Sequence, residues 1–188
     1  SLALLSVAAD NLFKVLRWRD LLGPAGRQIG LWRLLLVFLS GQMLNTLVPA
    51  RVGDLSRALA AGTPTSGRSY ALGTVVLEKI IDLLWYALLF VLLLLLLPLP
   101  GWLGDSAWGV LAGALAIGAA TFLLASRRVA FLRLLERLSW HLPERWRAPL
   151  LARLHRGLGS LEILRQPTDL ARLAGWSTLV WLTALLTN

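Results

Sequence analysis

The sequence predicts an all-α integral membrane protein, a polytopic helix bundle with a re-entrant helical hairpin and a basic amphipathic interfacial segment. Three observations predict this fold class. Hydrophobic residues make up 57% of the 188-residue chain and the mean hydropathy is +0.68, whereas soluble domains are roughly 45–50% apolar. Leucine runs such as residues 92–97 contain no polar position. The basic residues cluster between apolar runs, as the positive-inside rule describes.

The first third of the chain is predicted to contain two short helices and no complete span. Residues 1–13 are mostly apolar and are interpreted as the end of a membrane helix, and residues 14–33 carry five Lys or Arg against one Asp. Residues 34–48 form an apolar helix that is shorter than the ~20 residues of a membrane span. Pro49 then breaks the helix. Residues 54–62 form a second short helix, with the residue at position 54 as its N-cap.

The rest of the chain alternates between apolar spans and one basic segment. A long helix is predicted from about residue 70 to 97, and a Gly- and Ala-rich span follows at 107–125. Residues 127–165 hold nine arginines among periodic apolar positions. This segment either lies in the membrane interface or forms a cytoplasmic helical hairpin that packs on itself. Residues 170–187 begin a final apolar helix.

The charge distribution predicts the topology. The basic segments 14–33 and 127–165 should both be cytoplasmic, whereas the connection 98–106 has no Lys or Arg and should lie outside. The two helices beside that connection supply two crossings, so the stretch 34–62 must supply none or two. It is too short for two spans of ~20 residues each, which predicts a re-entrant hairpin. In the alternative, residues 31–50 span the membrane and one basic cluster lies outside.

Composition and motifs argue against several other functions. Cys is absent, which excludes disulfides and thiolate metal sites. No HExxH, GxSxG, P-loop or GxGxxG motif occurs. The net charge of +9 does not indicate nucleic acid, because the basic residues lie between apolar runs and not on a polar face. We predict no catalytic residue, no metal site, no cofactor and no nucleic-acid partner. Residues 1–188 are expected to form one membrane domain that is incomplete at one or both ends.

A hairpin tip inside the membrane would favour an anion. The second short helix would point its N-terminus into the bilayer interior, where free N–H groups and the helix dipole attract negative charge. Arg51 and Arg57 add positive charge in a planar form that suits phosphate. Glu78 and Asp82 are four residues apart on one helix face, where they balance the arginines or bind an amine. The predicted headgroup-binding set is Asn45, Arg51, Gly53, Asp54, Arg57, Glu78, Lys79 and Asp82.

Two other functions remain open at this point. In the first, the charges are purely structural, because buried ions are normally paired and pairing implies no ligand. The pairs would join Arg51, Arg57 and Lys79 to Asp54, Glu78 and Asp82. In the second, the carboxylates act as bases or metal ligands in the membrane subunit of a lipid-modifying transferase.

Two motifs resemble those of a known family. The first is Asn45-x-x-x-Pro49-x-Arg51-x-Gly53-Asp54-x-x-Arg57, and the second runs from Ser69 to Glu78-Lys79-x-x-Asp82. Together with Leu16-Arg17-Trp18 and the late Trp-containing span, they are similar to the lysylphosphatidylglycerol synthase transmembrane, or flippase-like, family of bacteria and archaea. The resemblance covers about residues 14–188. Asp54 and Lys79 stand where Glu and Arg are more usual, and both keep the charge.

The resemblance implies a multi-pass domain of the bacterial cytoplasmic (inner) membrane that binds or translocates lipids. The implied ligand is an anionic phospholipid or a polyprenyl-phosphate lipid. In the synthases such a domain is joined to a soluble aminoacyl-transferase domain, which residues 1–188 do not contain. A synthase and a second copy of this chain are therefore the candidate protein partners.

Overall fold

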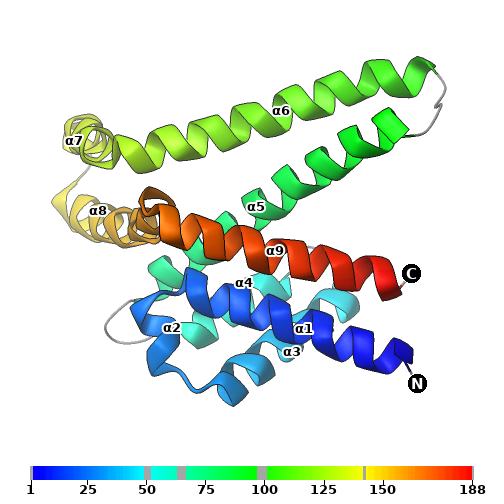
Figure 1. The fold of residues 1–188 in the computed structure, drawn as a ribbon. Helices are drawn as coiled ribbons and strands as arrows, with labels where there is room; N and C mark the ends of the chain where they lie inside the picture. The colour runs from blue at the N-terminus through cyan, green and yellow to red at the C-terminus, as the bar shows by residue number, and fades with distance from the viewer. Residues whose placement is uncertain (1, 49–51, 63–66, 97–100, 142, 188) are drawn as a thin grey trace.

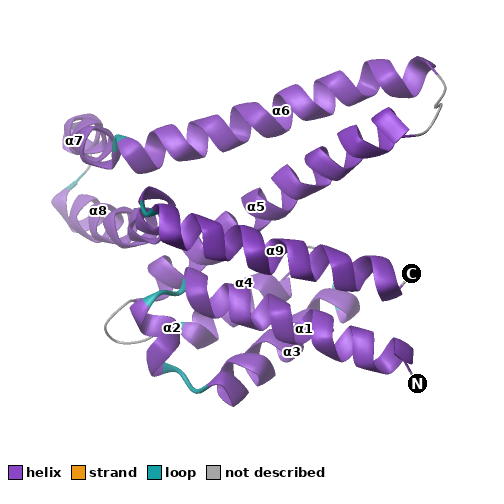
Figure 2. Ribbon diagram, in the orientation of Figure 1, coloured by secondary structure: helices purple, strands orange, loops and turns teal. Residues whose placement is uncertain are grey.

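The computed structural model describes residues 2–48, 52–62, 67–96, 101–141 and 143–187, and these residues form helices without a strand (Figures 1 and 2). This confirms that the fold is all-helical. The α-helices are α1 (Leu2–Leu21), α2 (Pro24–Gln28), α3 (Leu31–Leu47), α4 (Val52–Ala61), α5 (Gly67–Leu96), α6 (Gly101–Ser126), α7 (Arg128–Leu138), α8 (Glu144–Gly159) and α9 (Pro167–Thr187). Two 3₁₀ segments, η1 (Ser139–His141) and η2 (Ser160–Arg165), flank α8.

Two of the described helices are long and apolar enough to cross a membrane. They are α5, with a mean hydropathy of 2.4, and residues 106–126 of α6, with 1.9. Only 6% and 11% of their most apolar windows are buried. The core helix of a water-soluble protein would instead have its apolar surface covered. The uncovered apolar surface of α5 and α6 therefore supports a membrane location.

The helices form a bundle whose two ends differ in charge. α1 and α9 lie side by side, and both chain ends lie at the right in Figure 1. α2, from the first basic segment, and α7 and α8, from the second, lie at the left. The end of α5 and the start of α6 lie at the right. The arrangement is the one that the topology prediction requires, and the identity of the cytoplasmic end stays a prediction.

α3 and α4 pack against each other as an antiparallel helical hairpin. Their backbones touch at Gly41 and Gly53, where a Cβ added to Gly53 would overlap the Gly41 carbonyl oxygen. The Gly53 N–H donates a hydrogen bond of 2.8 Å to the side-chain oxygen of Asn45. The hairpin predicted within residues 34–62 is therefore present as a pair of helices. Its re-entrant position in the membrane stays a prediction, and residues 49–51 lie outside the described residues.

Two predicted boundaries were wrong. The basic segment was predicted to follow the first helix at residue 14, but α1 continues to Leu21. Arg17 and Trp18 are consequently inside the bundle, 1% and 0% exposed, because carboxylates of α5 neutralise the arginine there. α4 begins at Val52, so Asp54 lies within its first turn and is not the N-cap. A carboxylate in that turn still interacts favourably with the helix dipole.

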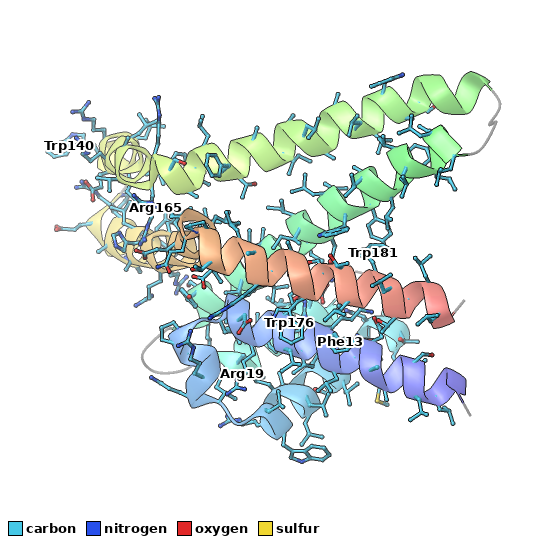
Figure 3. All side chains as sticks on the ribbon, in the orientation of Figure 1. Phe13, Arg19, Trp140, Arg165, Trp176 and Trp181 are labelled. Atoms are coloured by element: carbon cyan, nitrogen blue, oxygen red, sulfur yellow. The ribbon has the colours of Figure 1, made fainter. Side chains whose placement is uncertain are left out.

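The packing of α1 on α9 uses aromatic and polar side chains. The Phe13 and Trp176 rings lie 6.1 Å apart between the two helices (Figure 3). The Trp176 Nε1–H donates a hydrogen bond of 2.8 Å to Asp20 Oδ2. Further along the same contact, Arg17 Nη1 donates to Ser177 Oγ at 3.2 Å. These contacts join residues about 160 positions apart in the sequence.

The Arg-rich segment 127–165 folds into α7, η1, α8 and η2. α8 packs against α5, although none of its residues is fully buried. Apolar side chains of the segment remain exposed, among them Leu138, Trp140 and Trp146, and Trp140 projects away from the bundle in Figure 3. The position of this segment in the membrane interface stays a prediction.

Candidate functional site

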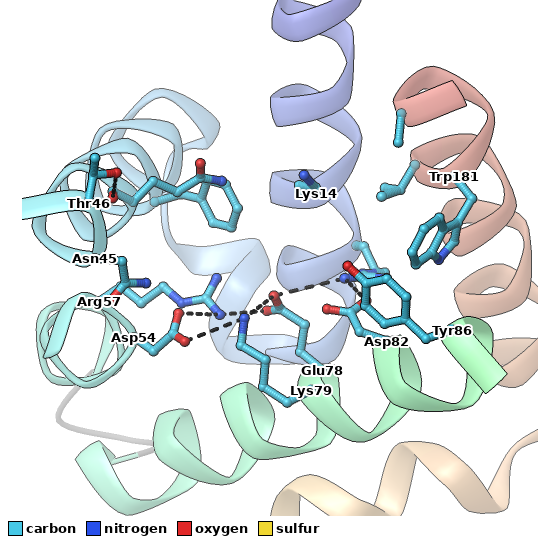
Figure 4. A pocket seen from close by; sticks show the side chains of 15 residues that line it. Lys14, Asn45, Thr46, Asp54, Arg57, Glu78, Lys79, Asp82, Tyr86 and Trp181 are labelled. Carbon is cyan, nitrogen blue, oxygen red and sulfur yellow. Dashed lines mark hydrogen bonds and ion pairs between the residues drawn. The ribbon is translucent and has the colours of Figure 1, made fainter. Parts of the chain in front are cut away.

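A cavity of about 400 Å³ lies where α1, α3, α4, α5 and α9 meet (Figure 4). Its volume is within the ~300–1,000 Å³ of small-molecule sites. Six of the eight predicted site residues line it, namely Asn45, Asp54, Arg57, Glu78, Lys79 and Asp82. Gly53 lies at the α3–α4 contact, and Arg51 lies outside the described residues. We call this space the central cavity.

Arg57 of α4 is held between two aromatic rings and two carboxylates. Its guanidinium carbon lies 5.1 Å from the ring centroids of both Trp18 and Phe38, which is close enough for cation–π attraction. Its Nη2 lies 3.0 Å from Glu78 Oε2 and 3.3 Å from Asp54 Oδ1. Only 3% of the Arg57 side chain is exposed. The aromatic pair and the two acids together compensate for the loss of water around this charge.

Arg17 of α1 is a second buried cation at the cavity. Its Nη2 lies 2.7 Å from Asp82 Oδ1 and 3.9 Å from Glu78 Oε1. The prediction omitted this residue because it fell within the basic segment 14–33. A signal was present, since Asp10, Lys14 and Arg17 recur at the i, i+4 and i+7 positions of one helix face. In the structure Lys14 pairs with Asp10 at 2.7 Å and also lines the central cavity.

Lys79 completes a balanced network at the more open edge of the site. Its side chain is 42% exposed, and its Nζ lies 3.4 Å from Asp54 Oδ2 and 4.0 Å from Glu78 Oε1. Among the described residues, the network contains three cations, Arg17, Arg57 and Lys79, and three carboxylates, Asp54, Glu78 and Asp82. Glu78 is its centre, because it lies within 4.0 Å of all three cations.

This pairing leaves several polar atoms unsatisfied. In the described part of the chain, Nε of Arg17, Nε and Nη2 of Arg57 and Nε1 of Trp181 are buried without a hydrogen bond. Arg57 Nη2 and Glu78 Oε2 are close in space at 3.0 Å, but they are not aligned for a hydrogen bond. A buried donor without a partner costs about 1–3 kcal/mol. Trp18 Nε1 and Glu78 Oε2 are likewise buried without a hydrogen bond in this part of the chain, so most of the unsatisfied polar atoms are N–H donors.

The α9 side of the cavity is aromatic. The rings of Trp181 and Tyr86 meet edge to face with centroids 4.5 Å apart, and both residues line the cavity beside Asp82. The predicted set of site residues did not include Trp181. No local pattern distinguishes it from the other tryptophans, because its place at the site depends on how α9 packs against α1 and α5.

The carboxylates do not gather as metal ligands within the described residues. No group of three or more His, Asp or Glu side chains in that part of the chain is arranged to hold a metal ion. Each of Asp54, Glu78 and Asp82 lies against a cation. The N-terminus of α4 is also partly occupied, since the Gly53 N–H already donates to Asn45. The side-chain donors around the cavity include Arg17, Arg57 and Trp181 together with Lys14 and Lys79.

Comparison with known proteins gave one family. No curated protein and no solved structure matched the chain significantly. The model of one protein family, described as the lysylphosphatidylglycerol synthase TM region, matches residues 1–187, nearly the whole chain. The match confirms the resemblance seen in the hairpin and α5 motifs. The chain therefore belongs to the lysylphosphatidylglycerol synthase TM region family.

Proposed function

We propose that this protein binds the phosphate-bearing headgroup of an anionic phospholipid or polyprenyl-linked lipid in the central cavity, and that it moves the lipid across the membrane. The observation that carries the proposal is the surplus of buried N–H donors on Arg17, Arg57 and Trp181. Phosphate oxygens accept several such hydrogen bonds at once, and the planar guanidinium group suits them. Membership of a family named for a lipid synthase supports a lipid as the source of the phosphate.

The balanced charge of the network restricts the headgroup. A phosphate that enters would leave uncompensated negative charge beside Glu78 and Asp82, which is costly away from water. An amine on the same headgroup would offset that charge by pairing with these carboxylates. A headgroup with both a phosphate and an amine therefore suits the site best.

The same proposal places the protein in the bacterial inner membrane. The end of the bundle that carries α2, α7 and α8 faces the cytoplasm, because its arginines obey the positive-inside rule. The α3–α4 hairpin then enters from the cytoplasmic side and returns, and the central cavity lies within the membrane. Broken helices and charged residues are tolerated at that depth where they line a polar cavity.

A purely structural network is the second candidate. The observation that favours it is the equal number of cations and carboxylates among the described site residues. It leaves the unpartnered Trp181 Nε1 without an explanation, because this donor is uncharged and takes part in no ion pair. Trp181 therefore provides a test that does not disturb the charges.

Replacing Trp181 with phenylalanine is expected to weaken headgroup binding about tenfold. The substitution removes the indole N–H and keeps an aromatic ring against Tyr86, and a hydrogen bond to a charged group contributes about 1.5–3 kcal/mol. Calorimetric titration of the detergent-solubilised protein with a short-chain phosphatidylserine, whose anionic headgroup carries both a phosphate and an amine, measures the change. The control is Trp108→Phe, since Trp108 is 72% exposed on α6 and does not line the cavity.

Equal affinity of the two variants would contradict a headgroup contact at Trp181 and would leave the structural network as the better account. Transport requires a separate measurement. A phosphatidylserine with a fluorescent acyl chain is expected to move between leaflets faster in liposomes that contain the native protein than in protein-free liposomes. Equal rates in the two preparations would rule out the transport half of the proposal.

A further inference from the structure

A second cavity, of about 790 Å³, lies at the end of the bundle that carries α2 and α8. It is bounded by the α1–α2 turn, the start of α5, α8 with η2, and the start of α9. None of the residues that line it lines the central cavity. We call it the terminal cavity.

A buried layer separates the two cavities. On α5, Tyr70 lines the terminal cavity and Glu78 the central one, and the fully buried Thr74 lies between them on the same helix face. On α9, the buried Ser177 lies between Arg172 and Trp181 along the helix. Eight residues of helix separate Tyr70 from Glu78, which corresponds to about 12 Å. The terminal cavity is therefore a separate space and not an extension of the first.

Four arginines from four different helices line the terminal cavity. They are Arg27 of α2, Arg128 of α7, Arg156 of α8 and Arg172 of α9. Arg128 is fixed in place, because its Nη1 lies 3.5 Å from Glu162 Oε2 and its Nη2 donates to the His155 carbonyl oxygen at 3.1 Å.

The other three arginines have no ion pair or hydrogen bond within the described residues. Three acids also line the cavity, but two of them are engaged. Asp20 accepts the hydrogen bond from Trp176, and Glu162 pairs with Arg128. The hydrogen bond from the neutral indole leaves Asp20 its charge, so Asp20 and Asp169 remain against three arginines that have no ion pair. The lining therefore carries one more cation than it carries carboxylates, and an anion in the cavity would balance that charge.

Tyr70 contributes a hydroxyl group to the same wall. Its ring and hydroxyl lie between two glycines: a Cβ added to Gly23 would lie 3.5 Å from Tyr70 Oη, and one added to Gly159 would lie 3.4 Å from Tyr70 Cδ2. Gly23 has a positive φ of 57°, a conformation that glycine adopts without strain. The tight α1–α2 turn thereby brings the backbone against the tyrosine and closes one side of the cavity.

We infer that the terminal cavity is a second phosphate-binding site, in which Arg156 and Arg172 bind the phosphate and Arg128 and Tyr70 orient it. Its volume is within the range of sites for organic ligands, so a phosphate ester fits as well as a free phosphate. Guanidinium groups from separate helices can donate to different oxygens of one phosphate at once. The ester is either the headgroup of a membrane lipid at that end of the bundle or a soluble phosphorylated molecule.

The test compares two double variants with equal changes in charge. Arg156→Gln with Arg172→Gln removes the two free arginines of the cavity. Arg145→Gln with Arg153→Gln removes two arginines of α8 that are exposed, as Arg156 and Arg172 are, but do not line the cavity. None of these four side chains has an ion pair or hydrogen bond within the described residues, so both double variants are expected to fold. Thermal unfolding of each purified variant checks this.

Two arms identify the source of the phosphate. In the first, pyrophosphate is titrated into the protein in phosphatidylcholine nanodiscs. In the second, native mass spectrometry counts the phosphatidylglycerol molecules that the protein retains from nanodiscs of mixed lipid. We expect saturable binding in one arm. The double variant of Arg156 and Arg172 is expected to weaken it at least about tenfold, and the control double variant of Arg145 and Arg153 less than about twofold. Binding in the first arm indicates a soluble ligand and binding in the second indicates a lipid.

No saturable binding in either arm would overturn the inference, as would an equal loss in both double variants. The Trp181→Phe variant tests whether the measured binding belongs to the terminal cavity or to the central cavity. It is expected to keep full binding at the terminal cavity, and a matching loss there would show that the probe reports on the central cavity alone.

Discussion

Gly53→Ala is expected to destabilise the protein by about 3 kcal/mol, the upper end of the usual cost of overpacking. The added Cβ would overlap the Gly41 carbonyl oxygen, which is backbone and cannot move aside as a flexible side chain can. α3 and α4 would have to separate, and the hydrogen bond from the Gly53 N–H to Asn45 would be lost. The free energy of unfolding of the detergent-solubilised protein measures the effect.

Gly113→Ala is the matched control. Gly113 lies in α6 where an added Cβ meets no atom within 4 Å, and Gly→Ala inside a helix stabilises by up to about 1 kcal/mol. Equal stabilities of the two variants would mean that the α3–α4 backbone contact is looser than the structure gives. A selective loss at Gly53 would show that the hairpin is a fixed element of the fold.

Arg57→Ala is expected to cost about 3–5 kcal/mol of stability, because removing one partner of a buried ion pair leaves an uncompensated charge. Here the charge left behind is Glu78, whose side chain is 4% exposed and whose nearest cation is Arg57 at 3.0 Å. Lipid movement in liposomes is expected to stop as well. Arg133→Ala is the control, since Arg133 is exposed on α7 and is remote from the central cavity.

Because Arg57→Ala removes so much stability, two gentler changes are needed to separate a ligand contact from a structural one. Arg57→Lys keeps the charge beside Glu78 and removes the planar set of donors, so it is expected to fold and to bind the headgroup weakly. Exchanging the charges, with Arg57→Glu and Glu78→Arg together, is expected to recover stability without lipid movement. Recovery of both by the exchanged pair would show that the charges only pair with each other.

The local features of this chain could be predicted from its sequence. The length of α5 and the apolar run in its second half predicted a helix from about residue 70 to 97, and the structure has it at Gly67–Leu96. Two short helices were predicted within residues 34–62, and the structure has α3 and α4 there. Glu78 and Asp82, four residues apart, were predicted to share a face and both line the central cavity. These features depend on spacing along one helix, which is visible in a single sequence.

Tertiary packing decided which residues line the central cavity. Arg17 was assigned to a basic segment at the membrane surface, and the structure buries it against Asp82 and Glu78. Its charge is tolerated there only because α5 brings two carboxylates to α1. The prediction that relied on Arg51 cannot be compared, since that residue lies outside the described residues. The terminal cavity was not predicted at all, because its four arginines come from four helices separated in sequence.

The sequence by itself therefore determined that this protein is a bundle of apolar helices with a glycine-containing hairpin and a charged face on its longest helix. Hydrophobicity and helical spacing are short-range properties, so both are visible in the sequence of a single helix. Only the tertiary structure decided that Arg17 is buried inside the bundle, and that Trp181 closes the central cavity from the α9 side. Both depend on contacts between residues about 160 positions apart, such as that of Arg17 with Ser177. The packing of one helix on another is not recorded in the residue spacing of either helix, so these contacts could not be predicted from the sequence.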